Sequence, residues 1–154
     1  MALKIERATM AECRFVYDLA VESSVRRMST DPRQFSFEDH QGWYASRIAD
    51  PDVLFLIGHA PDGPVGYVRY ARHGNAAEVA IAVARDLRDR GYARELLRVG
   101  DERAFSELAV SSLIALVLPP NEASRTLFSR AGYALTGSEV RSGTTHDRYE
   151  RRRP

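Results

Sequence analysis

Cysteine and lysine are nearly absent from this 154-residue sequence, which contains only Cys13 and Lys4 of these two types. A single cysteine excludes an internal disulfide and any metal site built from several thiolates, so we expect a cytoplasmic protein without a metal. Apolar runs are short, and none approaches the roughly 20 residues that a membrane helix needs. Residues 1–6 also lack the basic-then-apolar pattern of a signal peptide. We therefore expect no membrane partner.

An excess of charge of one sign is also missing, because 22 basic residues stand against 21 acidic residues for a net charge of +1. With neither a basic surplus nor a nucleic-acid-binding motif, the chain is not expected to bind nucleic acid. Nearly every positive charge is an arginine, which suits anion recognition, although a compositional bias explains it more simply. Residues 151–154 are expected to form a solvated basic tail.

The residues that are abundant describe an ordinary folded domain. An apolar content of 44% and a charged content of 28% are typical of globular proteins, and we expect one domain over residues 1–150. Hydrophobic periodicity predicts an α+β fold with a mixed sheet, in which residues 78–118 form a right-handed βαβ unit. The expected strands are 3–8, 53–60, 65–72, 78–83, 112–118, 133–140 and 144–150, and the expected helices are 9–23, 36–50, 91–108 and 121–130.

Side chains that can cap a helix mark two of these helix starts. Thr9 and Glu12 have the spacing of a capping box, and Ser36 precedes the second helix. The polar residues 24–35 include Pro32 and are expected to form a loop. Cys13 falls on the apolar stripe of the first helix, and with no basic partner nearby it is expected to be a core residue.

An arginine-rich loop joins the strand at 78–83 to the helix at 91–108. The N-terminus of a helix presents unpaired backbone N–H groups, which attract an anion and disfavour cations. A bound diphosphate would offset the crowding of arginines at this junction. An ordinary turn with solvated arginines explains the loop about as well when it is considered alone. The four arginines are Arg85, Arg88, Arg90 and Arg94.

Two segments resemble motifs of the GNAT N-acetyltransferases. Residues 88–93, Arg-Asp-Arg-Gly-Tyr-Ala, resemble the Arg/Gln-x-x-Gly-x-Gly/Ala loop that binds the pyrophosphate of acyl-CoA. Residues 121–133 are similar to the family pattern Asn-x-x-Ser/Ala-x-x-Leu-Tyr-x-x-x-Gly-Phe. Two motifs on a matching order of elements are more specific than either alone. The resemblance implies the GNAT fold over essentially the whole chain: a mixed, mostly antiparallel sheet, splayed at its centre and flanked by helices.

The resemblance also implies an enzyme that moves an acetyl group from acetyl-CoA directly to a primary amine of a small molecule. In the family, the pantetheine arm lies along the strand at 78–83 like an added strand, and a backbone N–H there polarises the thioester carbonyl. The residue at 121 also has a structural explanation as a helix N-cap. The implied cofactor-binding residues are Ala82, Val83, Arg88, Asp89, Arg90, Gly91, Tyr92, Ala93, Asn121, Ser124 and Phe128.

The attacking amine must lose a proton, and Glu78 resembles the position of the general base in several family members. A solvated carboxylate at a strand start explains Glu78 equally well. Three histidines are weaker candidates for the base, since a lone histidine is more often a surface or capping group. They are His40, His73 and His146.

Phe128 departs from the family pattern, because many relatives have a tyrosine there that is thought to protonate the departing thiolate. A thiol with a pKa of about 8.5 leaves tolerably well without protonation. Tyr133 and Tyr149 are the alternative proton donors that the sequence offers, although Tyr133 lies where the family has a core aromatic. The departure makes a non-catalytic acyl-CoA-binding domain the rival interpretation.

His40 and Trp43 are the candidate acceptor-binding residues. Residues 36–44 resemble a Ser-x-x-x-His-x-x-Trp/Phe segment of bacterial GNAT enzymes that acetylate nucleotide-linked amino sugars. A core anchor explains Trp43 at least as well, with His40 as its neighbour on the same helical face. Polyamines, amino acids and protein N-termini remain alternative acceptors, and the resemblance makes a homodimer a further expectation.

Overall fold

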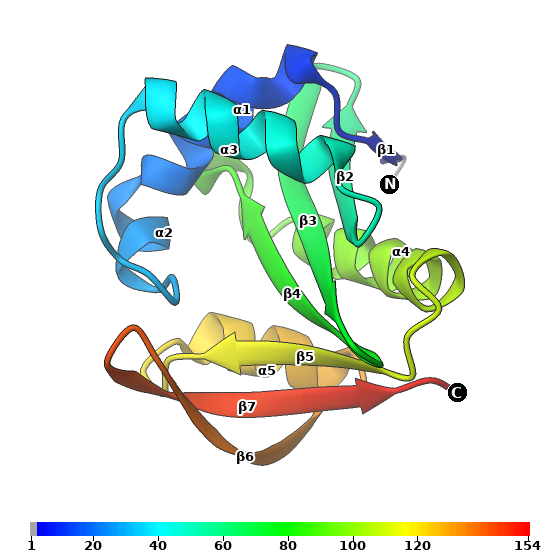
Figure 1. Ribbon diagram of the computed structural model, residues 1–154. Coiled ribbons are helices and arrows are strands. Elements are labelled where there is room, and N and C mark those ends of the chain that lie inside the picture. The colour runs from blue at the N-terminus through cyan, green and yellow to red at the C-terminus, as the bar shows by residue number, and fades with distance from the viewer. Residues whose placement is uncertain (1–2) are drawn as a thin grey trace.

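The computed structural model describes residues 3–154, apart from the side chains of Ser23 and Ser24. Its centre is a seven-stranded sheet in the order β1-β2-β3-β4-β5-β7-β6 (Figure 1). The only parallel pair in this described sheet joins β4 to β5, so the α+β fold with a mixed, mostly antiparallel sheet is confirmed. The strands are β1 (Lys4–Arg7), β2 (Val53–Ala60), β3 (Gly63–His73), β4 (Ala76–Val83), β5 (Ser112–Val117), β6 (Ala134–Arg141) and β7 (Thr144–Arg152).

The helices cover both faces of the sheet. Helices α1 and α3 pack on one face of β2–β4, and α4 packs on the opposite face, while α5 contacts β5 and β6 (Figure 1). The helical segments are η1 (Met10–Glu12), α1 (Cys13–Val21), α2 (Ser23–Arg27), α3 (Phe37–Ala49), η2 (Arg85–Leu87), α4 (Tyr92–Glu107) and α5 (Glu122–Arg130).

The capping signals in the sequence are confirmed, but the expected loop at 24–35 is partly wrong. Thr9 and Glu12 form the capping box, and the Ser36 hydroxyl accepts a hydrogen bond from the backbone of Asp39 at 3.1 Å. The one-turn helix α2 occupies the start of the expected loop. The Glu22 carboxylate stabilises this helix by accepting from the Val25 backbone N–H at 3.3 Å. A single turn is too short to produce a hydrophobic period, so the sequence pattern does not reveal it.

Strand β2 is continuously apolar because both of its faces are buried. Phe55 and Ile57 face α1 and α3 in one core cluster, whereas Leu54 and Leu56 belong to the cluster that α4 covers. Cys13 is 4% exposed in the first of these clusters, which confirms its expected place in the core. The alternation of strand side chains thus divides the apolar interior into two cores on opposite faces of one sheet.

Strands β4 and β5 separate shortly after they meet. Their parallel pairing begins at Ala76 and Ser112 and ends at Glu78 and Ile114. Beyond this point β4 continues for five more residues to Val83 beside β3 alone. The sheet is therefore splayed at its centre, as expected, and Figure 1 shows the two strands diverging.

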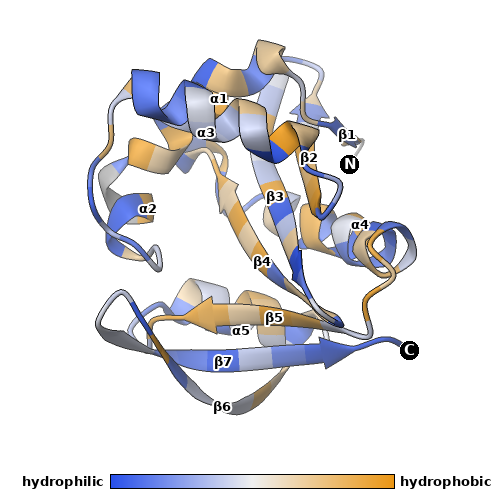
Figure 2. Ribbon diagram, viewed as in Figure 1, coloured by the Kyte–Doolittle hydropathy of each residue, from blue (hydrophilic) through white to orange (hydrophobic). Residues whose placement is uncertain are grey.

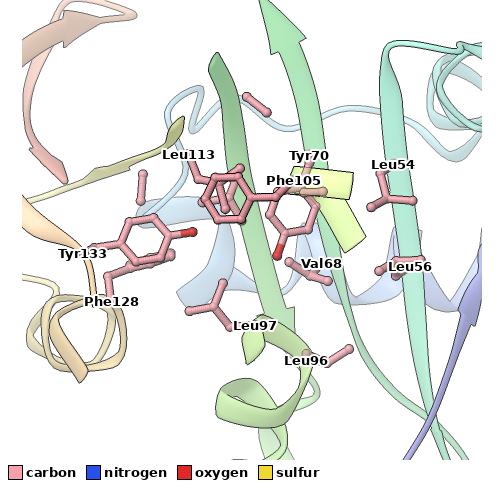
Figure 3. Close-up of a cluster of buried hydrophobic side chains, with 14 of the residues drawn as sticks. Leu54, Leu56, Val68, Tyr70, Leu96, Leu97, Phe105, Leu113, Phe128 and Tyr133 are labelled. Carbon is pink, nitrogen blue, oxygen red and sulfur yellow. The ribbon is translucent and has the colours of Figure 1, made fainter. Parts of the chain in front are cut away.

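A buried carboxylate connects the two halves of the splayed sheet behind the gap. Asp101 of α4 is fully buried and accepts hydrogen bonds from Tyr70 at 2.7 Å and Tyr133 at 3.0 Å. The Arg151 guanidinium completes the network at 2.9 Å. Tyr70 lies in β3, whereas Tyr133 and Arg151 belong to the β6–β7 half, and Figure 3 shows both tyrosines among the side chains of the apolar cluster.

The expected solvated tail at 151–154 is exposed from Arg152 onward, but its first two residues belong to a strand. The boundary at residue 150 falls inside β7, where Arg151 pairs with Leu113 and Arg152 pairs with Ser112. Beyond the strand, the Arg153 backbone donates to Ser111 at 2.8 Å, and its guanidinium donates to the carbonyls of Val110 and Phe105. Long-range backbone pairing orders this segment, which a local run of charge cannot reveal.

Candidate active site

A cleft of about 1100 Å³ opens where β4 and β5 diverge. Residues 78–83 of β4 line one wall, and Leu116 and Val117 of β5 with α5 line the other. Figure 2 shows both strands as largely hydrophobic. The α1–α2 region, residues 28–35, α3 and the loop before α4 also border the cleft, and ion pairs from Arg85 and Arg88 to Glu22 hold that loop beside α2.

The arginine-rich loop turns sharply at two positions with positive φ. Asp89 has φ 64° and Gly91 has φ 82°, which glycine adopts without a steric cost. Arg88 is held by the protein itself, because its Nε donates to the Val83 carbonyl at 3.2 Å and its Nη2 lies 3.4 Å from the Glu22 carboxylate. Such turns direct successive backbone N–H groups into a concave surface that suits an anion.

Helix α4 begins at this loop without a side-chain cap. Its N-cap residue is Gly91, which has no side chain to accept from the first turn, and the Glu95 N–H is the first to bond back to the Gly91 carbonyl. The N–H groups of Tyr92, Ala93 and Arg94 therefore remain as donors at the positive end of the helix dipole. This end of the cleft is built to accept a negatively charged group.

Helix α5 supplies the opposite wall. Asn121 caps it by accepting from the Ser124 backbone N–H at 3.2 Å, so the structural role expected for Asn121 is confirmed. Phe128 is 4% exposed and packs edge-on against Tyr133. Of the expected cofactor-binding residues, all except Arg90 border the cleft: Ala82, Val83, Arg88, Asp89, Gly91, Tyr92, Ala93, Asn121, Ser124 and Phe128.

Glu78 borders the cleft at the point where the pairing of β4 and β5 ends. Its carboxylate is held by Arg141 of β6, with Nη2 at 3.0 Å from Oε1 and Nη1 at 3.2 Å from Oε2. Arg141 also contacts Glu139 at 2.6 Å, and the hydrogen bonds to both carboxylates raise the pKa of Arg141. Glu78 is thus an oriented, half-buried carboxylate and not a freely solvated strand end.

Neither tyrosine named as an alternative proton donor borders the cleft. The Tyr133 hydroxyl donates to Asp101 in the core, and burial, with Asp101 second, raises the pKa of Tyr133 well above its usual range. Tyr149 is buried in β7 and borders a separate shallow depression beside Arg125. The core position expected for Tyr133 is confirmed, and neither tyrosine is placed to replace the family tyrosine, because long-range packing directs both away from the cleft.

His40 and Trp43 border the cleft but also belong to an aromatic cluster. His40 is 2% exposed, and neither ring nitrogen has a hydrogen-bond partner within the geometric limits among the described residues. Burial lowers the pKa of His40, and the nearby Cys13 backbone opposes this shift. Trp43 packs on Phe55 with 6.3 Å between ring centroids, so a core role for this pair has direct support. The rings around His40 are Tyr17, Phe35, Phe37, Trp43 and Tyr44.

The other two histidine candidates lie away from the cleft. His73 is exposed at the end of β3, and His146 is buried in β7 with its Nδ1 3.0 Å from the Thr144 carbonyl. Within residues 3–154, no cluster of three or more histidine, cysteine or acidic side chains is arranged to hold a metal. Nor is any helix in this described range long and apolar enough to cross a bilayer.

Two cleft residues were not identified from the sequence. Tyr67 and Arg69 alternate along β3 with their side chains on the face that α1 and α3 cover. Arg69 is a charged residue within the otherwise apolar run from Val65 to Tyr70, and this interruption is the signal that could have identified it. Sequence alone does not say which face of the sheet it occupies.

A family model described as an acetyltransferase (GNAT) domain matches residues 3–134. This match spans most of the chain, so the chain belongs to the GNAT acetyltransferase family and is an enzyme of that class. No curated protein is significantly similar to it in sequence.

Several solved GNAT structures share its fold at low sequence identity. Aminoglycoside acetyltransferase AAC(6')-Ib in complex with coenzyme A is 15% identical, with a TM-score of 0.83 over 99% of this chain and 95% of that chain. Spermidine N-acetyltransferase from Vibrio cholerae, in complex with CoA and spermine, is 19% identical, with a TM-score of 0.81 over 96% of this chain and 92% of that chain. The Salmonella typhimurium protein yncA with acetyl-CoA is 17% identical, with a TM-score of 0.79 over 99% of this chain and 94% of that chain.

Proposed function

We propose that the protein transfers an acetyl group from acetyl-CoA directly to a primary amine of a small molecule. The observation that carries this proposal is the cleft between β4 and β5, which joins an open strand edge to an uncapped helix N-terminus. These two features suit the two chemically different parts of acyl-CoA, an amide-containing arm and a diphosphate. The solved structures with CoA or acetyl-CoA support this choice of co-substrate.

Backbone groups would supply most of the co-substrate binding. The free edge of β4 near Ala82 and Val83 can pair with the amides of the pantetheine arm as an added strand would. The N–H groups of residues 88–93 can bind the diphosphate, which also compensates for the arginines around them. Asn121, Ser124 and Phe128 of α5 would close the cleft from the other side.

The transfer needs a proton acceptor but no enzyme nucleophile. The amine nitrogen attacks the thioester carbonyl carbon, the carbon–sulfur bond breaks, and the proton lost by the amine passes to a base. Glu78 is the candidate base, and its pairing with Arg141 keeps it oriented toward the cleft end of β4. With Phe128 in place of the family tyrosine, the sulfur leaves as a thiolate that takes its proton from solvent.

Residues 36–44 supply the candidate acceptor-binding side chains. The segment at 36–44 favours a nucleotide-linked amino sugar as the acceptor, with His40 and Trp43 near it. The structural neighbours include an aminoglycoside acetyltransferase and a spermidine N-acetyltransferase. A cytoplasmic location and a homodimer also stay predictions. The molar mass of the purified protein in solution tests the dimer.

Calorimetry with acetyl-CoA, combined with a turnover screen of amines, tests the proposal. Gly91→Glu should abolish acetyl-CoA binding, because it adds a carboxylate and a strained φ where the diphosphate is expected. Gly42→Glu is the matched control, because Gly42 lies on α3 with open space around it and outside the cleft. Retained affinity in folded Gly91→Glu would contradict the loop assignment. Binding without turnover of any amine would instead favour the non-catalytic acyl-CoA-binding domain.

A further inference from the structure

Arg69 borders the cleft near Glu78, which attracts it, but it is not bonded to any carboxylate among the described residues. Its guanidinium makes no hydrogen bond or ion pair within the described part of the chain, and it stacks on Trp43 with 4.9 Å between Cζ and the ring centroid. Burial lowers the pKa of this partly exposed guanidinium, and Tyr67 and Glu78 oppose the shift. The stacking fixes the side chain but leaves its N–H donors available.

The sheet register gives Arg69 a small concave surface. Arg69 pairs with Ala80 of β4, and Tyr67 pairs with Ala82, so a large donor side chain faces a methyl group at both positions. Paired residues of antiparallel strands project from the same face, which places these four side chains together. The Tyr67 hydroxyl, like the Arg69 guanidinium, has no hydrogen-bond partner among the described residues. Two unused donors therefore border a space that the alanines leave open.

The charges around this space favour an incoming anion. Arg26 also borders the cleft, and its charge is close enough to oppose that of Arg69. Two acidic residues of the same region are already paired: Asp31 with Arg33 at 2.7 Å, and Glu78 with Arg141 at 3.0 Å. Asp39 is the other acidic residue at this end, and it lies in the first turn of α3, where the helix dipole stabilises a negative charge.

We propose that the acceptor carries an anionic group, a carboxylate or a phosphate, which Arg69 and the Tyr67 hydroxyl bind beside Ala80 and Ala82. This inference rests on the proposed function and deepens it by defining the acceptor class. Glu78 lies two residues from Ala80 on the same face of β4, so an acceptor amine can approach Glu78 while its anion binds Arg69. Trp43 then acts by positioning Arg69. Purely cationic amines, such as polyamines, are poor acceptors.

Pairs of amines that differ only in the anion test the inference. O-phosphoethanolamine is compared with ethanolamine, and leucine with leucinamide, with spermidine and kanamycin as polycations. The anionic member of at least one pair should have a KM lower by about tenfold to a hundredfold, the range expected for a hydrogen bond to a charged group. The phosphate pair and the carboxylate pair distinguish the two anions.

Arg69→Gln should remove this preference by raising the KM of the anionic member. The KM values of the partner that lacks the anion and of acetyl-CoA should stay within about twofold. Arg47→Gln is the matched control, because Arg47 also lies over Trp43, at 5.9 Å, but does not border the cleft. A lower KM for spermidine or kanamycin than for every anionic amine would overturn the inference. Equal KM values within both pairs would overturn it as well. The wild-type comparison decides the matter even if Arg69→Gln fails to fold.

The same pairs are also measured by thermal shift of the intact protein, which requires no turnover. If acetyl-CoA is neither bound nor consumed, the proposed function fails. A greater stabilisation by O-phosphoethanolamine than by ethanolamine, lost in Arg69→Gln, would still support the anion site. If acetyl-CoA is consumed but no anionic amine is preferred, the proposed function stands and the anion site is refuted.

Discussion

Removing one hydroxyl from the Asp101 network should destabilise the protein more than removing an equally buried hydroxyl elsewhere. Tyr133→Phe deletes a 3.0 Å hydrogen bond to the Asp101 carboxylate, while the core retains the aromatic ring. Hydrogen bonds to charged groups contribute about 1.5–3 kcal/mol, against about 1 kcal/mol for neutral pairs. Because Tyr70 and Arg151 still stabilise the carboxylate, we expect a loss of about 2 kcal/mol in the free energy of unfolding.

Tyr44→Phe is the matched control for this substitution. The Tyr44 side chain is buried, as that of Tyr133 is, but its hydroxyl donates to the neutral carbonyl of the exposed Thr9 at 2.7 Å, so its loss should lower the free energy of unfolding by about 1 kcal/mol. Asp101→Leu should lower the free energy of unfolding by about 3–5 kcal/mol, because it leaves two tyrosine hydroxyls and the Arg151 guanidinium without their acceptor.

Urea unfolding followed by far-ultraviolet circular dichroism measures these differences. Burial raises the pKa of Asp101 and its three hydrogen-bond donors oppose that shift, so the experiment is run at pH 8 to keep the carboxylate charged. Equal losses for Tyr133→Phe and Tyr44→Phe would refute the reasoning, because the acceptor of Tyr133 would then behave as a neutral group.

Three further predictions concern the base, the buried histidine and the strand contacts beside the cleft. Glu78→Gln should lower the acetylation rate by about a hundredfold or more and leave the affinity for acetyl-CoA unchanged. The loss of rate should be largest at low pH, and an unchanged pH–rate profile would contradict the role of Glu78 as base. Since the folded-state pKa of His40 is lowered, the unfolded chain binds more protons, and unfolding free energy should fall as the pH drops below about 6.5. His40→Phe should flatten this dependence in urea titrations, and an unchanged slope would contradict it. Gly66→Ala should lower the free energy of unfolding by about 1–3 kcal/mol in the same assay, because its Cβ would lie 2.5 Å from the Ala82 carbonyl oxygen. An unchanged free energy of unfolding would show that β4 shifts to make room for the methyl group.

Local signals predicted the secondary structure and one end of the site. Thr9, Ser36 and Asn121 each cap the helix that follows, and a cap needs only neighbours within three residues. The loop at 88–93 was recognisable for a similar reason, because its glycine and the helix N-terminus are adjacent in the chain. The divergence of β4 from β5 came from the family resemblance and not from these local patterns.

Contacts between segments that are far apart in the chain could not be predicted from the sequence. Glu78 meets Arg141 from 63 residues away, and Asp101 meets Tyr70, Tyr133 and Arg151 from separations of 31 to 50 residues. Each contact depends on sheet register and on which face of a strand a side chain occupies. For this reason, the sequence left open the surroundings of Glu78 and the partner of the Tyr133 hydroxyl.

The short junction between β4 and β5 has a consequence for how the native protein opens. The antiparallel unit β1–β4 and the unit β5–β7–β6 share backbone hydrogen bonds over only three residue pairs in the described sheet, so side chains, including the Asp101 network, supply most of the coupling between them. Hydrogen exchange should therefore divide the amides of the sheet into two cooperative groups that meet at Glu78 and Ile114. A ligand that lies between β4 and β5 contacts both groups, so its binding should merge them into one and slow exchange on both sides.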